Sequence, residues 1–393
     1  MKNLLLGALL LVSSLQAMSL REIIDSSLQG SPSLEAITAR LEAKRQTVEI
    51  ADNFDNPELF MTKNTLDNSQ AMSQTLLSFK QKIPTYSKRQ KRQAVAIADE
   101  KVLQEELHAA KVKLVERIKA EAYSLWELRE RQRIIDEYTT LTQQNIRLYE
   151  SYTSSSESEH MGIMKAQLSL SDLKVQKRAL DAKIAAAYAR LSYLAATEVS
   201  HLELDLQMGS QPDLQKLTDK VSENNPDLRI IHQTLQKQHA KLTLAEINNY
   251  PDITLLGSYA YRESYENYFN VGIALSLPIY GTEDAKEERE RALLLAQKSQ
   301  ESDISLQITS QLRVYYAQML SAYKIYHIIT DDALPQIAHM FALSSSSVAT
   351  GSDLFKYIDI LFQKLELEKK SIEAIANYKM AEAKIAALQG DLQ

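Results

Sequence analysis

The sequence predicts a mainly α-helical protein with a small β part, built from long antiparallel coiled-coil hairpins of helices and four strands. Three observations lead to this fold class. Residues 85–161 form a stretch of 77 residues without Gly or Pro. The chain also repeats itself at an offset of 194 residues. In each repeat the hydrophobic period changes from about 3.6 to about 2 after a proline.

The N-terminus, residues 1–17, reads as a secretory signal peptide. Lys2 precedes the apolar run 4–12, and polar residues then lead to Ala17. A membrane anchor is the less favoured alternative, because a spanning helix needs about 20 apolar residues. Without Lys2, the chain has 44 basic and 51 acidic residues. We therefore expect an exported chain without a basic surface for nucleic acid.

The repeat divides the chain into two units, residues 18–211 and 212–393. Three prolines of the first half recur 194 residues later: Pro32 and Pro226, Pro57 and Pro251, Pro84 and Pro278. Each unit opens with a helix that ends before its second proline. In the first unit five residues of this helix form the predicted buried side: Leu34, Ile37, Leu41, Val48 and Ala51.

A long helix follows in each unit, at residues 86–150 and 282–343. Each reaches a serine-rich tip and returns through a second helix, at 163–194 and 352–388. Apolar residues at steps of three and four predict a coiled-coil seam along the first long helix: Leu103, Leu107, Ala110, Leu114, Ile118, Leu125, Leu128, Ile135 and Tyr138. Pro335 has no counterpart in the first unit and predicts a local kink.

Between the opening helix and the long helix each unit carries a predicted strand hairpin, at residues 58–83 and 252–277. In the second hairpin every other residue is apolar: Ile253, Leu255, Gly257, Tyr259, Tyr261, Phe269, Val271, Ile273, Leu275 and Leu277. In the first, Lys63, Lys80 and Lys82 interrupt the pattern, so its placement rests on the repeat.

The predicted strands have the length that crosses an outer membrane, about 9 to 11 residues. No stretch of 18 apolar residues occurs in the sequence, so any membrane part would consist of strands. Because four strands cannot close into a barrel, several copies would have to share one.

Aromatic residues lie at both ends of the predicted hairpins, as at two membrane interfaces. Those at the helix end are Tyr86, Tyr250 and Tyr280, and those at the tip are Tyr261, Tyr268 and Phe269. The alternative is an ordinary soluble hairpin that is rich in tyrosine.

This order of elements resembles the TolC family of outer-membrane efflux proteins over the whole mature chain. Residues 277–281, Leu-Pro-Ile-Tyr-Gly, are similar to the family's junction between strand and helix, and residues 83–86 are a weaker copy. Residues 349–354, which contain Gly351, and residues 164–168 are similar to its tip segments. The order and spacing of these motifs carry the resemblance.

The resemblance implies a homotrimer with a shared 12-stranded β-barrel and a helical tunnel through the periplasm. It also implies docking to a periplasmic adaptor (membrane fusion protein) and to an inner-membrane transporter. The expected function is a passive exit duct in a Gram-negative outer membrane, serving tripartite efflux or type I secretion. The alternative is a periplasmic coiled-coil structural or adaptor protein without a pore. The cargo stays open among drugs, metal ions and polypeptides.

Acidic residues near the predicted tips are candidates for a gate that selects cations or holds the duct shut. They are Asp353 and Asp359, near Gly351, and Glu157 and Glu159, beside His160. The alternative is a solvated loop with ordinary surface acids.

Metal binding and catalysis have weaker support in the sequence. His160, Met161 and Met164 could bind Cu(I), but packing of the methionines between helices is favoured. His232 and His239 are expected to be packing or surface residues. With no phosphate-binding Gly-rich loop, no HExxH motif and no Cys, we expect neither an enzyme nor a cofactor.

Overall fold

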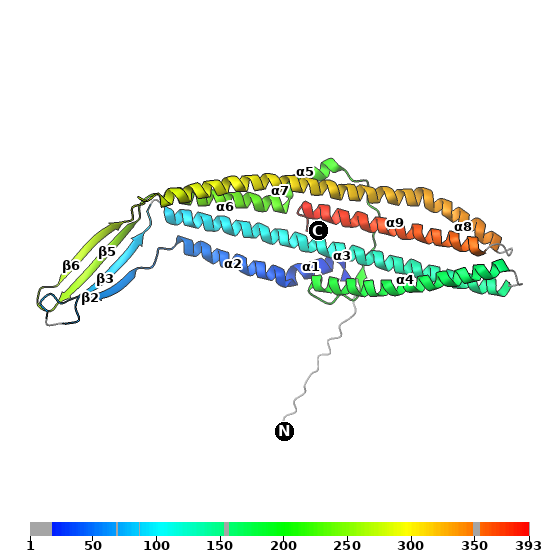
Figure 1. The fold of residues 1–393 in the computed structure, drawn as a ribbon, viewed down its shortest axis with the longest axis horizontal. Coiled ribbons are helices and arrows are strands. Elements are labelled where there is room, and N and C mark those ends of the chain that lie inside the picture. The colour runs from blue at the N-terminus through cyan, green and yellow to red at the C-terminus, as the bar shows by residue number, and fades with distance from the viewer. Residues whose placement is uncertain (1–17, 68–69, 86, 153–156, 349–353, 393) are drawn as a thin grey trace, which may run out of the picture. The chain divides into compact units, whose positions relative to one another are not determined.

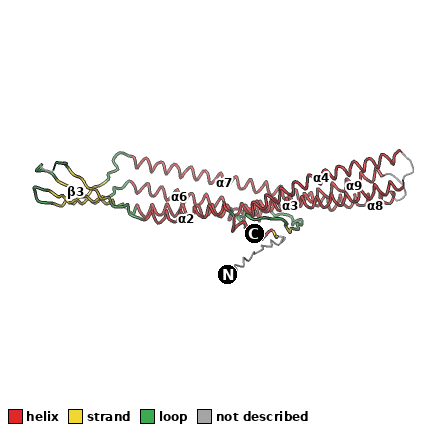
Figure 2. Tube along the Cα trace, turned by 90° about the horizontal axis from the view of Figure 1, so that it is seen from below, coloured by secondary structure: helices red, strands yellow, loops and turns green. Residues whose placement is uncertain are grey.

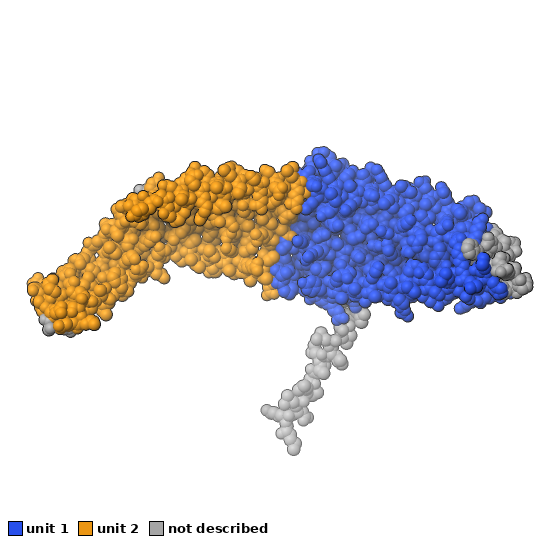
Figure 3. Space-filling model, viewed as in Figure 1, with its two compact units in different colours: residues 1–34, 110–223, 309–393 blue, residues 35–109, 224–308 orange. Residues whose placement is uncertain are grey.

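The computed structural model describes residues 18–67, 70–85, 87–152, 157–348 and 354–392. The predicted signal peptide lies outside this range, as do Tyr86, Gly351 and Asp353. Helices make up most of the described trace (Figure 2). The chain divides into two compact units, one of residues 1–34, 110–223 and 309–393 and one of residues 35–109 and 224–308 (Figure 3).

These compact units do not follow the predicted boundaries 18–211 and 212–393. Each compact unit contains segments of both sequence repeats. The long helices explain the difference, because α3 (Lys88–Tyr152) and α7 (Thr282–His327) each contribute residues to both compact units. We call residues 35–109 and 224–308 the strand unit, and the remaining residues the tip unit.

Two shorter helices of the strand unit, α2 (Pro32–Asp52) and α6 (Pro226–Asn248), begin at the first proline of each repeat (Figure 1). A proline suits this position because the first helical N–H has no partner within the helix. The side chain of Asn225 caps α6 by accepting hydrogen bonds from the N–H groups of Asp227 and Leu228. The predicted buried side of α2 is confirmed: Leu34 and Leu41 are buried, and Ile37, Val48 and Ala51 are half-buried.

Ion pairs tie these helices to α3. The carboxylate of Asp99 on α3 forms ion pairs with the ammonium groups of Lys44 on α2, at 2.5 Å, and of Lys237 on α6, at 2.9 Å. Arg229 of α6 bonds to Glu105 of α3 at 2.9 Å. One carboxylate therefore joins the opening helices of both repeats.

The strand unit also holds a four-stranded antiparallel sheet. Its strands are β2 (Glu58–Lys63), β3 (Gln74–Ile83), β5 (Ile253–Arg262) and β6 (Tyr268–Leu275), in the order β2-β3-β5-β6 (Figure 1). The central pair, β3 and β5, joins the hairpins of the two repeats over ten residue pairs.

A buried ion cluster holds the sheet onto the helices. The carboxylate of Asp252, just before β5, forms ion pairs with the ammonium groups of Lys88, at 2.8 Å, and Lys82, at 3.2 Å. It also accepts a hydrogen bond from the backbone N–H of Thr85 at 3.3 Å. The buried ammonium of Lys88 also donates to the carbonyl of Tyr250 at 2.5 Å. Since Lys88 begins α3 and Tyr250 lies between α6 and β5, the cluster joins the strand-to-helix junction of the first repeat to the helix-to-strand junction of the second.

The tip unit packs α1 (Leu20–Gly30), α4 (Glu157–Ala195), α5 (Leu214–Asn224) and α9 (Leu354–Leu388) with parts of α3 and α7. One apolar cluster joins α3, α4 and α9, and a second joins α1, α3 and α4. A short parallel ladder pairs β1 (Met18–Ser19) with β4 (Leu202–Glu203). The predicted seam of α3 is confirmed here, because Ile118, Leu125, Ile135 and Tyr138 are all buried.

The predicted distortion at Pro335 takes the form of a π-helical turn, Ile328–Ala333, between α7 and α8 (Leu334–Val348). The N–H of Leu334 donates to the carbonyl of Ile329, five residues back. Proline lacks the N–H of a normal helical turn, and its ring clashes with the carbonyl four residues before it. The wider turn just before Pro335 lets the helix continue.

The segment between β4 and α5 lies against α9 at Gly209. A Cβ at Gly209 would come within 2.6 Å of the ring of Tyr378. The hydroxyl of Tyr378 donates to the carbonyl of Ser210 at 2.7 Å. Only glycine permits this close approach of backbone and ring.

We predict that Gly209→Ala lowers the free energy of unfolding by about 1–3 kcal/mol, the usual cost of overpacking. The reason is the clash with Tyr378, so Gly209→Ala should cost less in a Tyr378→Ala chain than in the wild-type chain. Gly257→Ala is the control, because its new Cβ meets nothing within 4 Å. Thermal unfolding followed by circular dichroism measures both; equal losses in the two single variants would contradict the clash.

We also predict that Asp99→Asn lowers the free energy of unfolding at pH 7 by about 1 kcal/mol, as for a largely solvated ion pair. Partial burial opposes ionisation, but hydrogen bonds from Lys44 and Lys237 hold the pKa of Asp99 below its ordinary value. The stabilisation is therefore present above the ordinary pKa of about 3.9 and is lost as the pH falls through the lowered value.

Denaturant titrations of both proteins at several pH values test this dependence. The control is Glu42→Gln, which removes an exposed ion pair with Arg45 and should change stability by less than about 0.5 kcal/mol. A difference between wild type and Asp99→Asn that persists unchanged below the lowered pKa would refute the ionic role.

Candidate functional site

One face of the sheet is apolar across all four strands. In the β5–β6 pair, Leu255 lies opposite Ile273 and Tyr259 opposite Phe269, so the predicted alternation of this hairpin is confirmed. The same face continues over β3 and β2 with Phe79 opposite Leu59. We call this surface the apolar sheet face.

The large side chains of this face are exposed in the single chain. Val271 is 90% exposed, and nine others are exposed as well: Leu59, Met61, Leu77, Phe79, Leu255, Tyr261, Phe269, Ile273 and Leu275. Soluble monomers rarely expose apolar patches larger than a few hundred Å². The apolar sheet face therefore suits contact with an apolar environment rather than with water.

The opposite face of the sheet, which we call the polar face, carries most of the polar side chains, together with Phe60, Leu76 and Leu256. Lys80 on β3 pairs with Glu58 on β2 at 3.0 Å, and Asn270 donates to the hydroxyl of Ser258 at 3.3 Å. The expectation that Lys80 and Lys82 interrupt the strand pattern is wrong, because both alternate onto this polar face. Lys63 does share the apolar side, at the end of β2.

Both edges of the sheet lack a neighbouring strand within the described residues. β2 forms one edge and β6 the other. Unpaired N–H and C=O groups along an edge template the addition of another strand. An apolar face and two open edges together suit a sheet that more strands complete.

The predicted interface aromatics divide between the two faces. Tyr250, Tyr261, Phe269 and Tyr280 are exposed. Tyr268 pairs with Ala260 on the polar face, where its hydroxyl donates to Gln74 at 3.1 Å. Its placement at a membrane interface stays a prediction. Tyr86 lies outside the described residues.

Among the gate candidates, only Asp359 has a described side chain that meets another element. Its carboxylate on α9 forms an ion pair with Lys165 on α4. Glu157 and Glu159 lie in the first turn of α4, and His160 is exposed. Asp353 and Gly351 fall outside the described residues, so the acidic gate stays a prediction.

The methionines beside His160 are exposed, Met161 by 60% and Met164 by 69%. The expectation that they pack between helices is wrong for the single chain. His232 and His239 are exposed too, as expected for surface residues. In the part of the chain that the structure describes, His, Asp and Glu nowhere gather in threes as metal ligands would.

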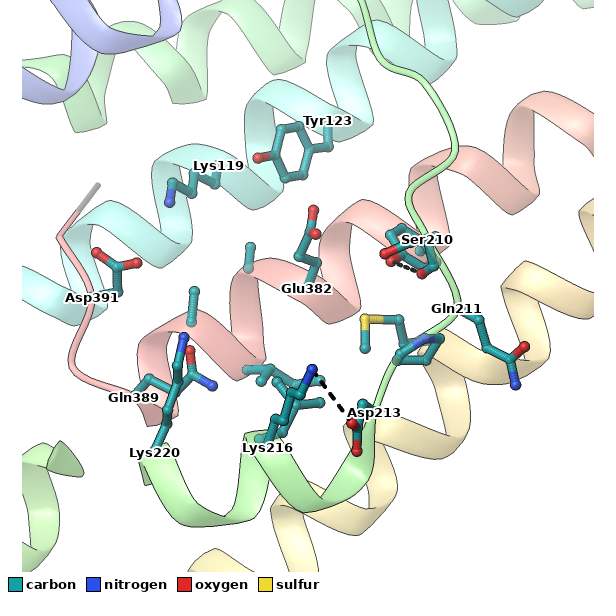
Figure 4. Close-up of a pocket in the computed structure, with 17 residues that line it drawn as sticks. Lys119, Tyr123, Ser210, Gln211, Asp213, Lys216, Lys220, Glu382, Gln389 and Asp391 are labelled. Atoms are coloured by element: carbon teal, nitrogen blue, oxygen red, sulfur yellow. Dashed lines mark hydrogen bonds and ion pairs between the residues drawn. The ribbon is translucent and has the colours of Figure 1, made fainter. Parts of the chain in front are cut away.

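A cavity of about 590 Å³ in the tip unit escaped the sequence analysis, because α3, α5 and α9 each supply part of its lining (Figure 4). Lys119 and Tyr123 come from α3, and Glu382 comes from α9. Burial lowers the pKa of Lys119, against the attraction of Asp391 and Glu382, and raises the pKa of Tyr123 to about 12. The basic and acidic groups balance, which suits mutual pairing better than binding of a charged ligand.

No helix in the described ranges is both long and apolar enough to cross a membrane. No family model matches the sequence, and no curated protein matches it either.

Solved structures do match the fold. The outer membrane protein VceC from Vibrio cholerae has a TM-score of 0.79 at 15% identity, with 95% of this chain and 97% of that chain covered. The MtrE outer membrane channel from Neisseria gonorrhoeae, in its open state, has a TM-score of 0.79 at 14% identity, covering 95% and 89%. The CmeC outer membrane channel from Campylobacter jejuni has a TM-score of 0.74 at 12% identity, covering 94% and 85%.

Each of these likenesses covers 94% or more of this chain. The chain therefore has the TolC-like fold of outer membrane channel proteins.

Proposed function

We propose that this chain is one subunit of a passive exit duct in a Gram-negative outer membrane. The single observation that carries the proposal is the apolar sheet face, exposed on all four strands and bordered by two open edges. Lipid tails would solvate the apolar sheet face. The unpaired backbone N–H and C=O groups along the two edges would then need hydrogen bonds from other strands.

Three copies would form a 12-stranded barrel, above the minimum of about 8 strands for a membrane barrel. Neighbouring strands of the sheet are all antiparallel, so the edge strands β2 and β6 run in opposite directions. The β6 edge of one copy can thus pair antiparallel with the β2 edge of the next. The polar face then lines the inside of the barrel.

In this proposal the helices form a tunnel through the periplasm. A periplasmic adaptor and an inner-membrane transporter dock to it and supply the energy, as in tripartite efflux or type I secretion. The likeness to solved outer membrane channels supports the duct.

The mass of the detergent-extracted complex, by light scattering with the detergent subtracted, tests the proposal first. We expect three chains, in the outer-membrane fraction of the cell. A monomer in the soluble periplasmic fraction would instead support a coiled-coil structural or adaptor protein without a pore.

We further propose that the ion pair between Lys165 and Asp359 holds the tip of the duct closed. It joins the two return helices, α4 and α9, near the tip. Both side chains are partly exposed, so the pair contributes up to about 1 kcal/mol. That is enough to change a ratio of open to closed states about fivefold.

Single-channel recordings in planar bilayers can separate two roles of Asp359. If the ion pair latches the tip, Lys165→Gln and Asp359→Asn should raise the open fraction alike, by up to about fivefold. If three Asp359 carboxylates form a cation-selective ring, only Asp359→Asn should change cation preference. Lys177→Gln, which removes an ion pair between α4 and α3, is the control. Unchanged recordings for both tip variants would exclude Asp359 from the gate.

A further inference from the structure

The cavity of the tip unit described above is built by one chain within one compact unit. Its lining comes from α3, residues 210–213, α5, α7, α9 and the residues that follow α9. Its volume of about 590 Å³ falls in the range of about 300–1,000 Å³ that small-molecule sites occupy. The cavity is therefore large enough for a ligand, and a single chain supplies its walls.

One wall of the cavity, residues 210–213, is held by specific contacts at both ends. The hydroxyl of Tyr378 donates to the Ser210 carbonyl at 2.7 Å, and the ring of Tyr378 leaves no room for a Cβ at residue 209. At the other end, Asp213 accepts a hydrogen bond from the N–H of Gln215 at 3.0 Å, at the start of α5. Ligand sites are usually largely formed before the ligand binds. This wall meets that condition.

Ionised side chains of both signs surround the cavity. The ammonium groups belong to Lys119, Lys216 and Lys220, and the carboxylates to Asp213, Glu382 and Asp391. Because three positive and three negative groups balance, the lining favours neither an anion nor a cation. Hydroxyl groups both donate and accept, so they can bond to ammonium and carboxylate groups alike. An uncharged ligand with several hydroxyl groups therefore fits this lining.

Glu382 lies where groups from two helices meet. Figure 4 shows its side chain extending from α9 toward Tyr123 and Lys119 of α3. Burial raises the pKa of Tyr123, and the charge of Glu382 adds to that rise. The ion pair of Glu382 with Lys379, at 2.8 Å, lies within α9 and leaves the carboxylate 47% exposed. A hydroxyl-rich ligand in the cavity would meet a carboxylate, a phenol and an ammonium together.

The lining also holds a donor that the chain itself does not satisfy. Gln389 lines the cavity, and its buried Nε2 has no hydrogen-bond partner among the described residues. A buried donor without a partner costs free energy. Rotation of this amide toward a ligand hydroxyl would supply the missing bond.

Apolar side chains complete the lining and favour a ring-shaped ligand. They are Leu217, Met319 and Ile385, and the rings of Tyr123 and Tyr378 line the cavity with them. A sugar ring carries hydroxyl groups around its rim and C–H groups on its faces. The C–H groups gain dispersion energy against apolar and aromatic side chains. An open-chain polyol has no such face.

We propose that this cavity binds a small uncharged sugar, a mono- or disaccharide. Glu382 and Lys119 bind its hydroxyl groups, and the ring of Tyr123 packs against its C–H face. The inference goes beyond the proposed function, because the site needs neither a pore nor a second copy.

Isothermal titration calorimetry tests the site on the whole protein, extracted in a detergent without a sugar headgroup. The probes are two uncharged disaccharides, maltose and N,N′-diacetylchitobiose. We expect at least one to bind with a Kd at or below about 1 mM. Sorbitol, an open-chain polyol, and glycylglycine, a zwitterion, should bind more weakly. Failure of both sugars to bind, or tighter binding of glycylglycine, overturns the proposal.

Variants place the sugar in the cavity. Glu382→Ala and Lys119→Met should each raise the Kd at least about tenfold, because each removes a hydrogen bond to a charged group. The matched control is Glu373→Ala, also on α9. Glu373 is 50% exposed and pairs with Arg131 at 2.9 Å, but it does not line the cavity. Circular dichroism confirms that each variant is folded. Unchanged affinity in both cavity variants, or an equal loss in Glu373→Ala, overturns the site.

Light scattering on the same samples separates this inference from the proposed function. A trimer that binds neither sugar overturns the sugar site and leaves the duct standing. A monomer that binds a sugar, and loses it in Glu382→Ala, supports the site and contradicts the duct.

Discussion

The exposed apolar face of the four-stranded sheet is the constraint on which the rest of this chain depends. Burying apolar surface is worth about 25 cal/mol per Å², and the large side chains of this face find no cover in their own chain. The open edges add unpaired backbone groups, which cost several kcal/mol each in lipid. In the function proposed above, lipid on the face and further strands at the edges would satisfy both demands together.

Within the chain, polar contacts set how the helices and strands meet. Asp99 joins α2 and α6 to α3, and Asp252 joins the end of β3 and the start of α3 to the junction between α6 and β5. A chain without Cys has no disulfides to hold such long elements in register. Each cluster also draws side chains from both sequence repeats, which is why the compact units cut across the repeats.

The sequence was informative wherever a pattern is local. Period and prolines located the helices, the strands and the seam through Ile118 and Tyr138, because each depends on neighbours within a few residues. The face of Lys80 was misjudged because strand register depends on partners far along the chain. The cavity around Lys119 and the pair of Lys165 with Asp359 could not be found either, since separate helices supply their members.

The π-turn before Pro335 links a local sequence pattern to contacts between helices that are far apart in the chain. Proline alone explains why an ordinary helical turn fails there, but a simple break would have rotated everything beyond it. The π-turn instead inserts one residue, so that the buried positions Ile329 and Ile337 are eight residues apart, one more than the seven between Ala322 and Ile329. Phe341 can therefore still pack on α9 while Met340 keeps its outward direction. One local irregularity thus keeps the buried side of this helix continuous past Pro335.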